Sequence, residues 1–155
     1  MYQTEQEHWV TGLDPVADAF SGTVNSDVVS LLEYNNVEFI AWWGVGATGT
    51  ITLTVEACDD VVPTTTSAVP FRSRRYTSAD TAVAAVNRAA AGFTTTAGST
   101  QRYICEIRAD ALLASGYRYA RLHSVESVDS PILGGILIRL SEPRYAIATP
   151  GTAVA

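Results

Sequence analysis

The sequence predicts an all-β fold, an antiparallel β-sandwich of the jelly-roll-like kind. From Ile51 to Ala57, apolar residues alternate with threonine and glutamate, which places the two sets on opposite faces of a strand. Short segments of this kind recur along the chain, separated by turn signals such as NN, DDVVP, AGST, ASG and DSP. Regular spacing of this type is typical of sandwiches and barrels. A chain of 155 residues suffices for one domain that buries roughly 70% of its unfolded surface.

Taken in order, the chain begins with a polar stretch, 1–27, in which Gly12, Pro15 and Gly22 interrupt any regular element. We expect an N-terminal arm there. Eight strands are expected next, at 28–32, 37–43, 51–58, 68–76, 93–96, 102–108, 117–124 and 132–140. They define a sandwich domain over 28–146. The remaining residues, 147–155, predict a flexible C-terminal tail because they offer little to anchor them.

The stretch GVGATG, 44–49, has the spacing of a nucleotide-binding loop. Such a loop must open a helix whose free N–H groups hold phosphate, but the sequence that follows alternates as a strand. VEFIAWW before it is also strand-like, so the glycines predict a hairpin between two paired strands.

One possible short helix lies near 79–91, where alanine is frequent. Ser78 or Asp80 can cap its start and Gly92 its end. Three apolar residues fall at helical spacing: Val83, Val86 and Ala90. A long loop is the alternative.

The charges are unevenly distributed along the chain. The net charge is −6, and lysine is absent. Residues 1–71 hold ten acidic residues and no basic one, whereas residues 72–155 hold ten arginines and six acids. The two parts either pair within one molecule or form head-to-tail contacts between copies. A pI near 4.7 and dispersed arginines disfavour nucleic acid as a partner.

The remaining composition disfavours a membrane span and a secretory signal. No apolar run approaches the roughly 20 residues of a membrane helix, and MYQTEQEHWV is polar. We therefore expect synthesis in a cytoplasm. Cys58 and Cys105 are expected to be free thiols, although a disulfide is possible if their strands are neighbours.

No motif indicates an enzyme, a cofactor site or a metal site. His8 and His123 are the only histidines, and the GxSxG, HExxH and P-loop patterns are absent. A cation site can be imagined at the end of the strand 51–58, where acids gather. The alternative is a solvated strand end that pairs with Arg72 or Arg74. The acidic strand-end residues are Glu56, Asp59 and Asp60.

The segment VEFIAWW is apolar on both faces, since Ile40 and Trp42 share one face with Glu38. An apolar second face indicates burial between layers or contact with a partner. An exposed tryptophan would be a strong anchor for such a contact. Tyrosines on strands, including Tyr145, are candidates for a sugar-binding platform or for packing. The candidate interface residues are Ile40, Trp42, Arg72, Arg74 and Tyr145.

Five segments together resemble a family of small virion structural proteins of tailed bacteriophages and prophages. They are SDVVSLLEYNN, WGVGATGTITLTVEACDD, TTTSAVPFRSR, GFTTTAGSTQRYICEI and SPILGGILIRLSEPRYA, and they cover roughly residues 26–146. The resemblance implies a non-enzymatic capsid decoration or cement protein at the capsid surface of a virion, made in the bacterial host cytoplasm. It implies a major capsid protein as partner and a homo-oligomer, with a trimer favoured. The alternatives are a tail or head-to-tail component, and a carbohydrate-binding adhesion module.

Overall fold

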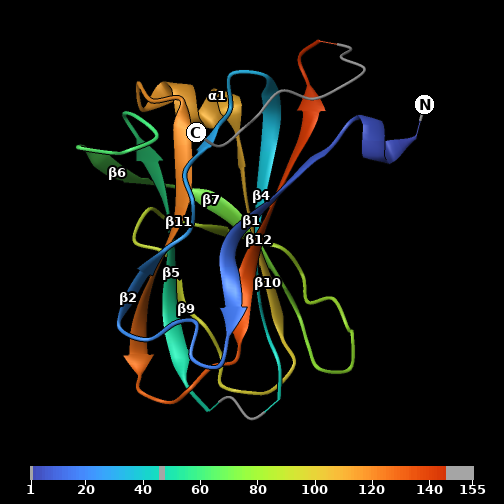
Figure 1. The fold of residues 1–155 in the computed structure, drawn as a ribbon, viewed down its shortest axis with the longest axis vertical. Coiled ribbons are helices and arrows are strands. Elements are labelled where there is room, and N and C mark those ends of the chain that lie inside the picture. The colour runs from blue at the N-terminus through green and yellow to red at the C-terminus, as the bar shows by residue number, and fades with distance from the viewer. Residues whose placement is uncertain (1, 46–47, 146–155) are drawn as a thin grey trace.

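A computed structural model describes residues 2–45 and 48–145 and confirms the antiparallel β-sandwich (Figure 1). The first sheet has the strand order β1-β12-β4-β10-β7-β8, and the second has the order β2-β11-β5-β6. Two short strands lie off this path, because β3 pairs with β11 and β9 pairs with β5. Every described strand pairing is antiparallel.

The strands of the first sheet are β1 (His8–Val16), β4 (Tyr34–Trp43), β7 (Phe71–Tyr76), β8 (Val86–Arg88), β10 (Arg102–Arg108) and β12 (Gly134–Pro143). Those of the second are β2 (Thr23–Asn25), β3 (Val29–Ser30), β5 (Thr50–Cys58), β6 (Thr66–Val69), β9 (Phe93–Thr94) and β11 (Tyr119–Val128). A short helix, α1 (Ala109–Ala114), lies at the end of the sandwich where β11 begins (Figure 1). A 3-10 turn, η1 (Gln3–Glu5), precedes β1.

The chain crosses repeatedly from one sheet to the other, as in a jelly roll. Strand β4 belongs to the first sheet and β5 to the second, so the two do not pair. The predicted hairpin at 44–49 is therefore wrong: this connection crosses between the sheets, and its residues 46–47 lie outside the described part. The predicted strand 68–76 also divides between the sheets at Pro70, because proline cannot donate to a strand ladder.

The core lies between the inner faces of the two sheets and contains a connected row of aromatic rings. Trp43 stacks on Tyr103 with centroids 5.1 Å apart, and Phe93 lies 5.6 Å from Tyr103. The indole Nε1 of Trp43 donates to the carbonyl oxygen of Gly98 at 2.9 Å. Of the adjacent tryptophans, Trp43 thus faces the core, which leaves Trp42 on the outer face.

The helix predicted near 79–91 is absent from the described structure, and part of the segment forms β8 instead. Val86, Asn87 and Arg88 pair with β7, and Arg88 Nε donates to Ser73 Oγ at 2.8 Å. The Arg88 guanidinium lies 4.2 Å from the ring centroid of Phe93. These tertiary contacts outweigh the helix propensity of alanine, which is a weak preference.

Two strands occur within 1–27, where we expected an irregular arm. Strand β1 pairs with β12, but its register shifts between Thr11 and Leu13 and again between Leu13 and Val16. Such bulges interrupt the alternation that identifies a strand and protect a sheet edge from further pairing. As a division into domains, the boundaries at 27 and 146 stay a prediction, and the predicted tail 147–155 lies outside the described residues.

Charges of the two parts of the chain pair within the molecule. Arg139 Nη1 donates to Glu38 Oε2 at 2.7 Å and also pairs with Glu7. Arg121 Nε donates to Glu56 Oε2 at 2.7 Å. The expected pairing of the acidic strand end with Arg72 or Arg74 is therefore wrong for Glu56. It is also wrong for the neighbouring Asp59, whose carboxylate accepts hydrogen bonds from Thr64 and Thr65.

Cys58 and Cys105 are both buried and unpaired, as expected. They lie in different sheets, in β5 and β10. Burial raises the pKa of the Cys58 thiol to about 11 and that of Cys105 to about 12. Within the described ranges, no helix is long and apolar enough to cross a membrane.

Candidate interaction surface

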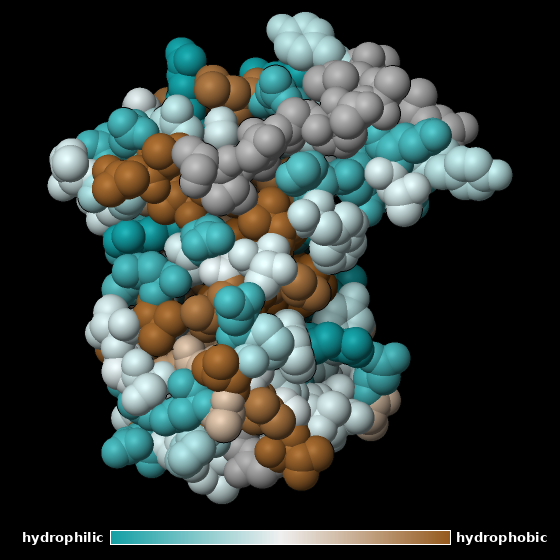
Figure 2. All heavy atoms as spheres, in the orientation of Figure 1, coloured by the Kyte–Doolittle hydropathy of each residue, from teal (hydrophilic) through white to brown (hydrophobic). Residues whose placement is uncertain are grey.

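Exposed apolar side chains are scattered over the molecule, and Figure 2 shows one face on which polar side chains interrupt them. Single exposed apolar residues are normal in soluble proteins, whereas aligned groups indicate contact sites. The outward residues of the first sheet form such an aligned group.

The strand register places these outward residues in rows across the sheet. One row contains Leu137, Ile40, Ile104 and Arg74, from β12, β4, β10 and β7 in turn. Facing residues of this kind lie about 4.5–5.5 Å apart between Cβ atoms. Three adjacent aliphatic side chains therefore form a continuous apolar strip that ends in a guanidinium group.

The next row places Trp42 opposite Arg102, which in turn faces Tyr76. The Arg102 guanidinium carbon lies 5.4 Å from the ring centroid of Tyr76, and Arg102 also pairs with Asp80. The row on the other side of the strip places Arg139, Glu38, Glu106 and Arg72 side by side. A charged row thus borders the apolar strip on one side, and a row of two aromatic residues and one arginine borders it on the other. Together these three rows are called the outer face of the first sheet.

Two grooves run over this outer face. The first, of about 540 Å³, has Ile40, Trp42 and Leu137 as apolar lining and Asp80 and Arg102 as charged lining. Its other lining residues are Trp43, Thr77, Ser78, Thr100 and Gln101. The second groove, of about 320 Å³, has the four charged residues of the bordering row in its lining, together with Arg74, Tyr76, Ile104, Ser73 and Ala85. A partner that fills both grooves would meet an apolar strip and a set of guanidinium groups together.

Arg139 fixes one end of the charged row. Its guanidinium binds Glu38 of β4 and Glu7, next to β1. The hydrogen bond from Arg139 lowers the pKa of Glu7, and the same contacts raise the pKa of Arg139. These bonds hold the start of β1 against the sheet, and with it Trp9, which faces Arg139 and is 50% exposed.

Arg72 and Arg74 are exposed, and neither forms an ion pair with any residue that the structure describes. They lie on the same side of the face, on β7. Arg72 lies beside Glu106 of β10, and Arg74 lies beside Ile104. Because neither guanidinium is held in an ion pair among the described residues, this side of the face favours carboxylates on a partner.

The structure brings together four of the five predicted interface residues on the outer face of the first sheet. The fifth, Tyr145, follows β12, is 70% exposed and lines neither groove. Three apolar residues on this side of the first sheet were not predicted from the sequence: Trp9, Ile104 and Leu137. The segment PILGGILIRL is apolar on both faces, like VEFIAWW, and that signal identifies Leu137.

The outer face of the second sheet has a different character. His123 Nδ1 lies 2.7 Å from Asn25 Oδ1, and Arg121 is bound to Glu56. Thr52 and Thr94 share a hydrogen bond of 3.0 Å. Its polar groups are therefore largely satisfied within the molecule. Across the described residues, no three potential metal ligands lie close enough together to hold an ion.

Comparisons with known proteins give likenesses of fold. No protein-family model matches the chain, and no curated protein matches it. The crystal structure of the SPBc2 prophage-derived protein YomS aligns with a TM-score of 0.44 and 8% identity, over 88% of this chain and 93% of that chain.

Two further structures are similar at lower scores. A structure of infectious bursal disease virus (Gx strain) aligns with a TM-score of 0.33 and 14% identity, over 90% of this chain and 34% of that chain. The CBM22-1 and GH10 modules of Clostridium thermocellum xylanase 10B, in complex with xylohexaose, align with a TM-score of 0.31 and 10% identity, over 94% of this chain and 30% of that chain. At these scores and identities, the likenesses carry no inference about function.

Proposed function

We propose that this protein is a non-enzymatic virion structural protein of a tailed bacteriophage, and that it decorates and stabilises the capsid. The sequence resemblance described above supports this class. The single observation that carries the proposal is the outer face of the first sheet, where Leu137, Ile40 and Ile104 form an apolar strip. A charged row borders the strip on one side, and the row of Trp42, Arg102 and Tyr76 borders it on the other. Apolar centres with charged rims are typical of protein contact sites.

The proposed partner is the major capsid protein, which would contribute carboxylates opposite Arg72 and Arg74. A working homo-oligomer, with a trimer favoured, follows from the decoration-protein resemblance, because three copies suit a local three-fold position on a capsid. A stable contact of either kind should bury at least about 1,000 Å² in total.

The test is binding of the purified protein to capsids that lack it, measured by co-sedimentation. We expect Leu137→Asp to reduce binding strongly, because it places a charge in the apolar strip. The matched control is Val125→Asp, since Val125 lies on the outer face of the second sheet and has the same exposed fraction as Leu137, 38%. Equal effects of the two substitutions would contradict the assignment of the binding face.

A second pair of variants tests the aromatic anchor. We expect Trp42→Ala to weaken capsid binding more than Glu5→Ala, because a central aromatic residue usually contributes more than an exposed charge at the rim. Sedimentation velocity of the free protein tests the trimer independently of capsid binding.

The groove at Trp42 favours a second candidate function, a carbohydrate-binding adhesion module. It combines an indole ring with the charged groups of Asp80 and Arg102, as orienting polar groups beside an aromatic surface do in ligand sites. Retention on immobilised glycans, lost in Trp42→Ala, together with no binding to capsids would favour this candidate over decoration.

A further inference from the structure

A separate pocket lies at the end of the sandwich that carries α1. Its volume is about 180 Å³, and its lining comes from the segment before β4, from α1, from the residues before β11 and from the residue after β12. The lining residues are Leu31, Leu32, Ala109, Leu112, Leu113, Tyr117, Arg118 and Arg144. None of them belongs to the outer face of the first sheet.

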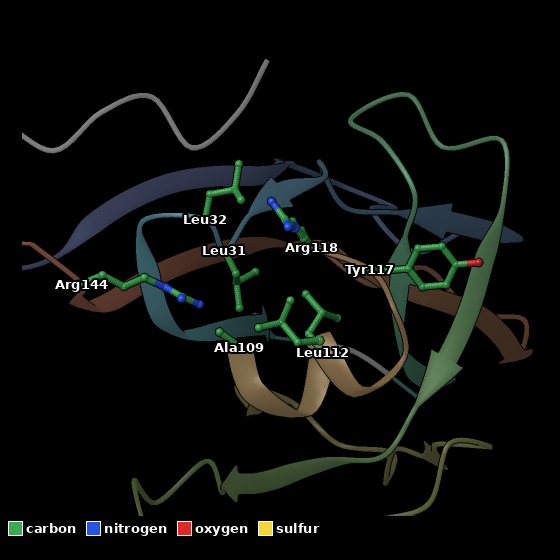
Figure 3. Close-up of a pocket in the computed structure, with 8 residues that line it drawn as sticks. Leu31, Leu32, Ala109, Leu112, Tyr117, Arg118 and Arg144 are labelled. Carbon is green, nitrogen blue, oxygen red and sulfur yellow. The ribbon is translucent and has the colours of Figure 1, made fainter.

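The floor of this pocket is apolar and rigidly placed. Figure 3 shows Leu31, Ala109 and Leu112 converging on one another. Their exposed fractions are 2%, 3% and 0%, so they also belong to the core. A side chain that enters the pocket therefore meets a preformed aliphatic surface.

The rim of the pocket includes two exposed leucine side chains. Leu32 is 45% exposed and Leu113 is 47% exposed, and they flank the buried floor. Exposed aliphatic side chains around a hollow are a feature of binding sites. An occupant that covers both would remove apolar area from water, which favours binding.

Two arginines complete the pocket, and Figure 3 shows their side chains on either side of Leu31. Their backbones are fixed: the Leu31 N–H donates to the Arg118 carbonyl at 3.0 Å, and the Arg144 N–H donates to the Glu33 carbonyl at 2.8 Å. Neither guanidinium forms an ion pair with a residue in the ranges 2–45 and 48–145. Two uncompensated positive charges thus stand beside an aliphatic floor.

We propose that this pocket binds the C-terminal residue of a polypeptide that ends in an aliphatic side chain. The side chain occupies the leucine-lined hollow, and the terminal carboxylate binds Arg118 and Arg144. Arginine is suited to this role because its planar guanidinium can bind a carboxylate through two hydrogen bonds. The inference does not depend on the proposed capsid contact.

The size and chemistry of the pocket select this occupant over others. Pockets for drug-sized ligands occupy about 300–1,000 Å³, whereas this one is about 180 Å³ and suits a single side chain. A free phosphate would satisfy the arginines but would leave the leucines exposed. A long acyl chain would not fit, and a cation would be repelled.

The test is titration of the full-length protein with short peptides, followed by NMR or calorimetry. The probes are a peptide ending in leucine with a free carboxylate, the same peptide as its C-terminal amide, the same peptide ending in glycine, and N-acetyl-leucine. We expect the free-acid leucine peptide to bind best and amidation to weaken binding about tenfold or more, since hydrogen bonds to charged groups contribute about 1.5–3 kcal/mol. Replacement of leucine by glycine should weaken binding as well.

Variants locate the site. Arg118→Gln and Arg144→Gln should each reduce affinity for the free acid and leave affinity for the amide nearly unchanged. Arg121→Gln is the control on the second sheet, where the guanidinium is already bound to Glu56, and it should change neither affinity. Equal binding of acid and amide, or no binding at millimolar peptide, would overturn the proposal. N-acetyl-leucine carries the same side chain and carboxylate, so it should bind as well; binding of the peptide without any binding of N-acetyl-leucine would place the contact elsewhere on the peptide and would also overturn the proposal.

Discussion

Replacement of Arg139 by glutamine tests how the acidic N-terminal segment is held on the sheet. The substitution removes the guanidinium that binds Glu7 and Glu38 and leaves two carboxylates without their shared cation. The side chains of Arg139, Glu7 and Glu38 are 25%, 9% and 18% exposed. They are therefore neither fully buried nor freely solvated.

This intermediate burial determines how much stability the Arg139→Gln substitution should remove. Breaking a fully buried pair costs about 3–5 kcal/mol, whereas an exposed pair contributes about 0.2–1 kcal/mol. We expect Arg139→Gln to lower the free energy of unfolding by about 2 kcal/mol near neutral pH, between these limits. The control is Arg102→Gln on the same outer face, where the side chains of Arg102 and Asp80 are 50% and 78% exposed. It should cost about 0–1 kcal/mol.

The pH dependence gives a sharper test of the same contact. The folded-state pKa of Glu7 lies below its usual 4.5, so the stabilisation is present above 4.5 and is lost as the pH falls through the folded-state value. In Arg139→Gln, protonation instead relieves the repulsion between the two carboxylates. Urea unfolding from about pH 7 to about pH 3 should therefore show the difference between wild type and variant shrinking with acid. A difference that stays constant over this range would refute the reasoning.

Three further predictions concern the core and its thiols. Cys58 and Cys105 should resist alkylation at about pH 8 until the protein unfolds, because their pKa values are about 11 and about 12; rapid labelling of the native protein, detected by mass spectrometry, would contradict this. Gly134→Ala should lower the free energy of unfolding by about 1–3 kcal/mol or more, since the new Cβ would lie 2.2 Å from the Trp42 carbonyl oxygen. The control is Gly44→Ala, where the new Cβ would lie 3.5 Å from its nearest neighbour. It should lower the free energy of unfolding by less, and both effects can be measured by thermal or urea unfolding. Thr95→Val should cost about 1–3 kcal/mol, because it removes the acceptor of the buried Ile51 N–H; the exposed Thr94→Val is its control, and equal midpoints in urea would show that the bond is not needed.

The sequence predicted strands well where burial on one face imposes alternation. In β5, Ile51, Leu53 and Val55 are fully buried and the threonines between them are partly exposed, so the pattern reports the structure directly. The alternation of apolar and polar residues carries no information about which other strand pairs with β5. The connection 44–49 shows this limit, since two well-predicted strands that it joins lie in different sheets.

The sequence predicted only part of the candidate surface, because a local pattern identifies single residues but not the strands beside them. Trp42 and Ile40 stood out because both faces of their strand are apolar, and their positions on the outer face follow from alternation with buried Trp43 and Phe39. The strip they belong to depends on register between distant segments, which no local pattern gives. The pocket at α1 is lined by four separate segments of the chain. Nothing in the sequence therefore indicated that Arg118 and Arg144 line the same pocket.

The two outer faces of the sandwich differ in a way that bears on the proposed decorating role. On the second sheet, Arg121 is bound to Glu56 and His123 lies against Asn25, so that face needs no partner for its charges. On the first sheet, Arg72 and Arg74 stand unpaired among the described residues at the border of an apolar strip. A protein that attaches to a surface requires one face that gains from contact and another that remains stable in water. This asymmetry makes Leu137→Asp against Val125→Asp the decisive comparison, because the two substitutions introduce the same charge at equal exposure. Leu137→Asp on the first sheet should strongly reduce attachment to capsids, and Val125→Asp on the second sheet should leave it intact.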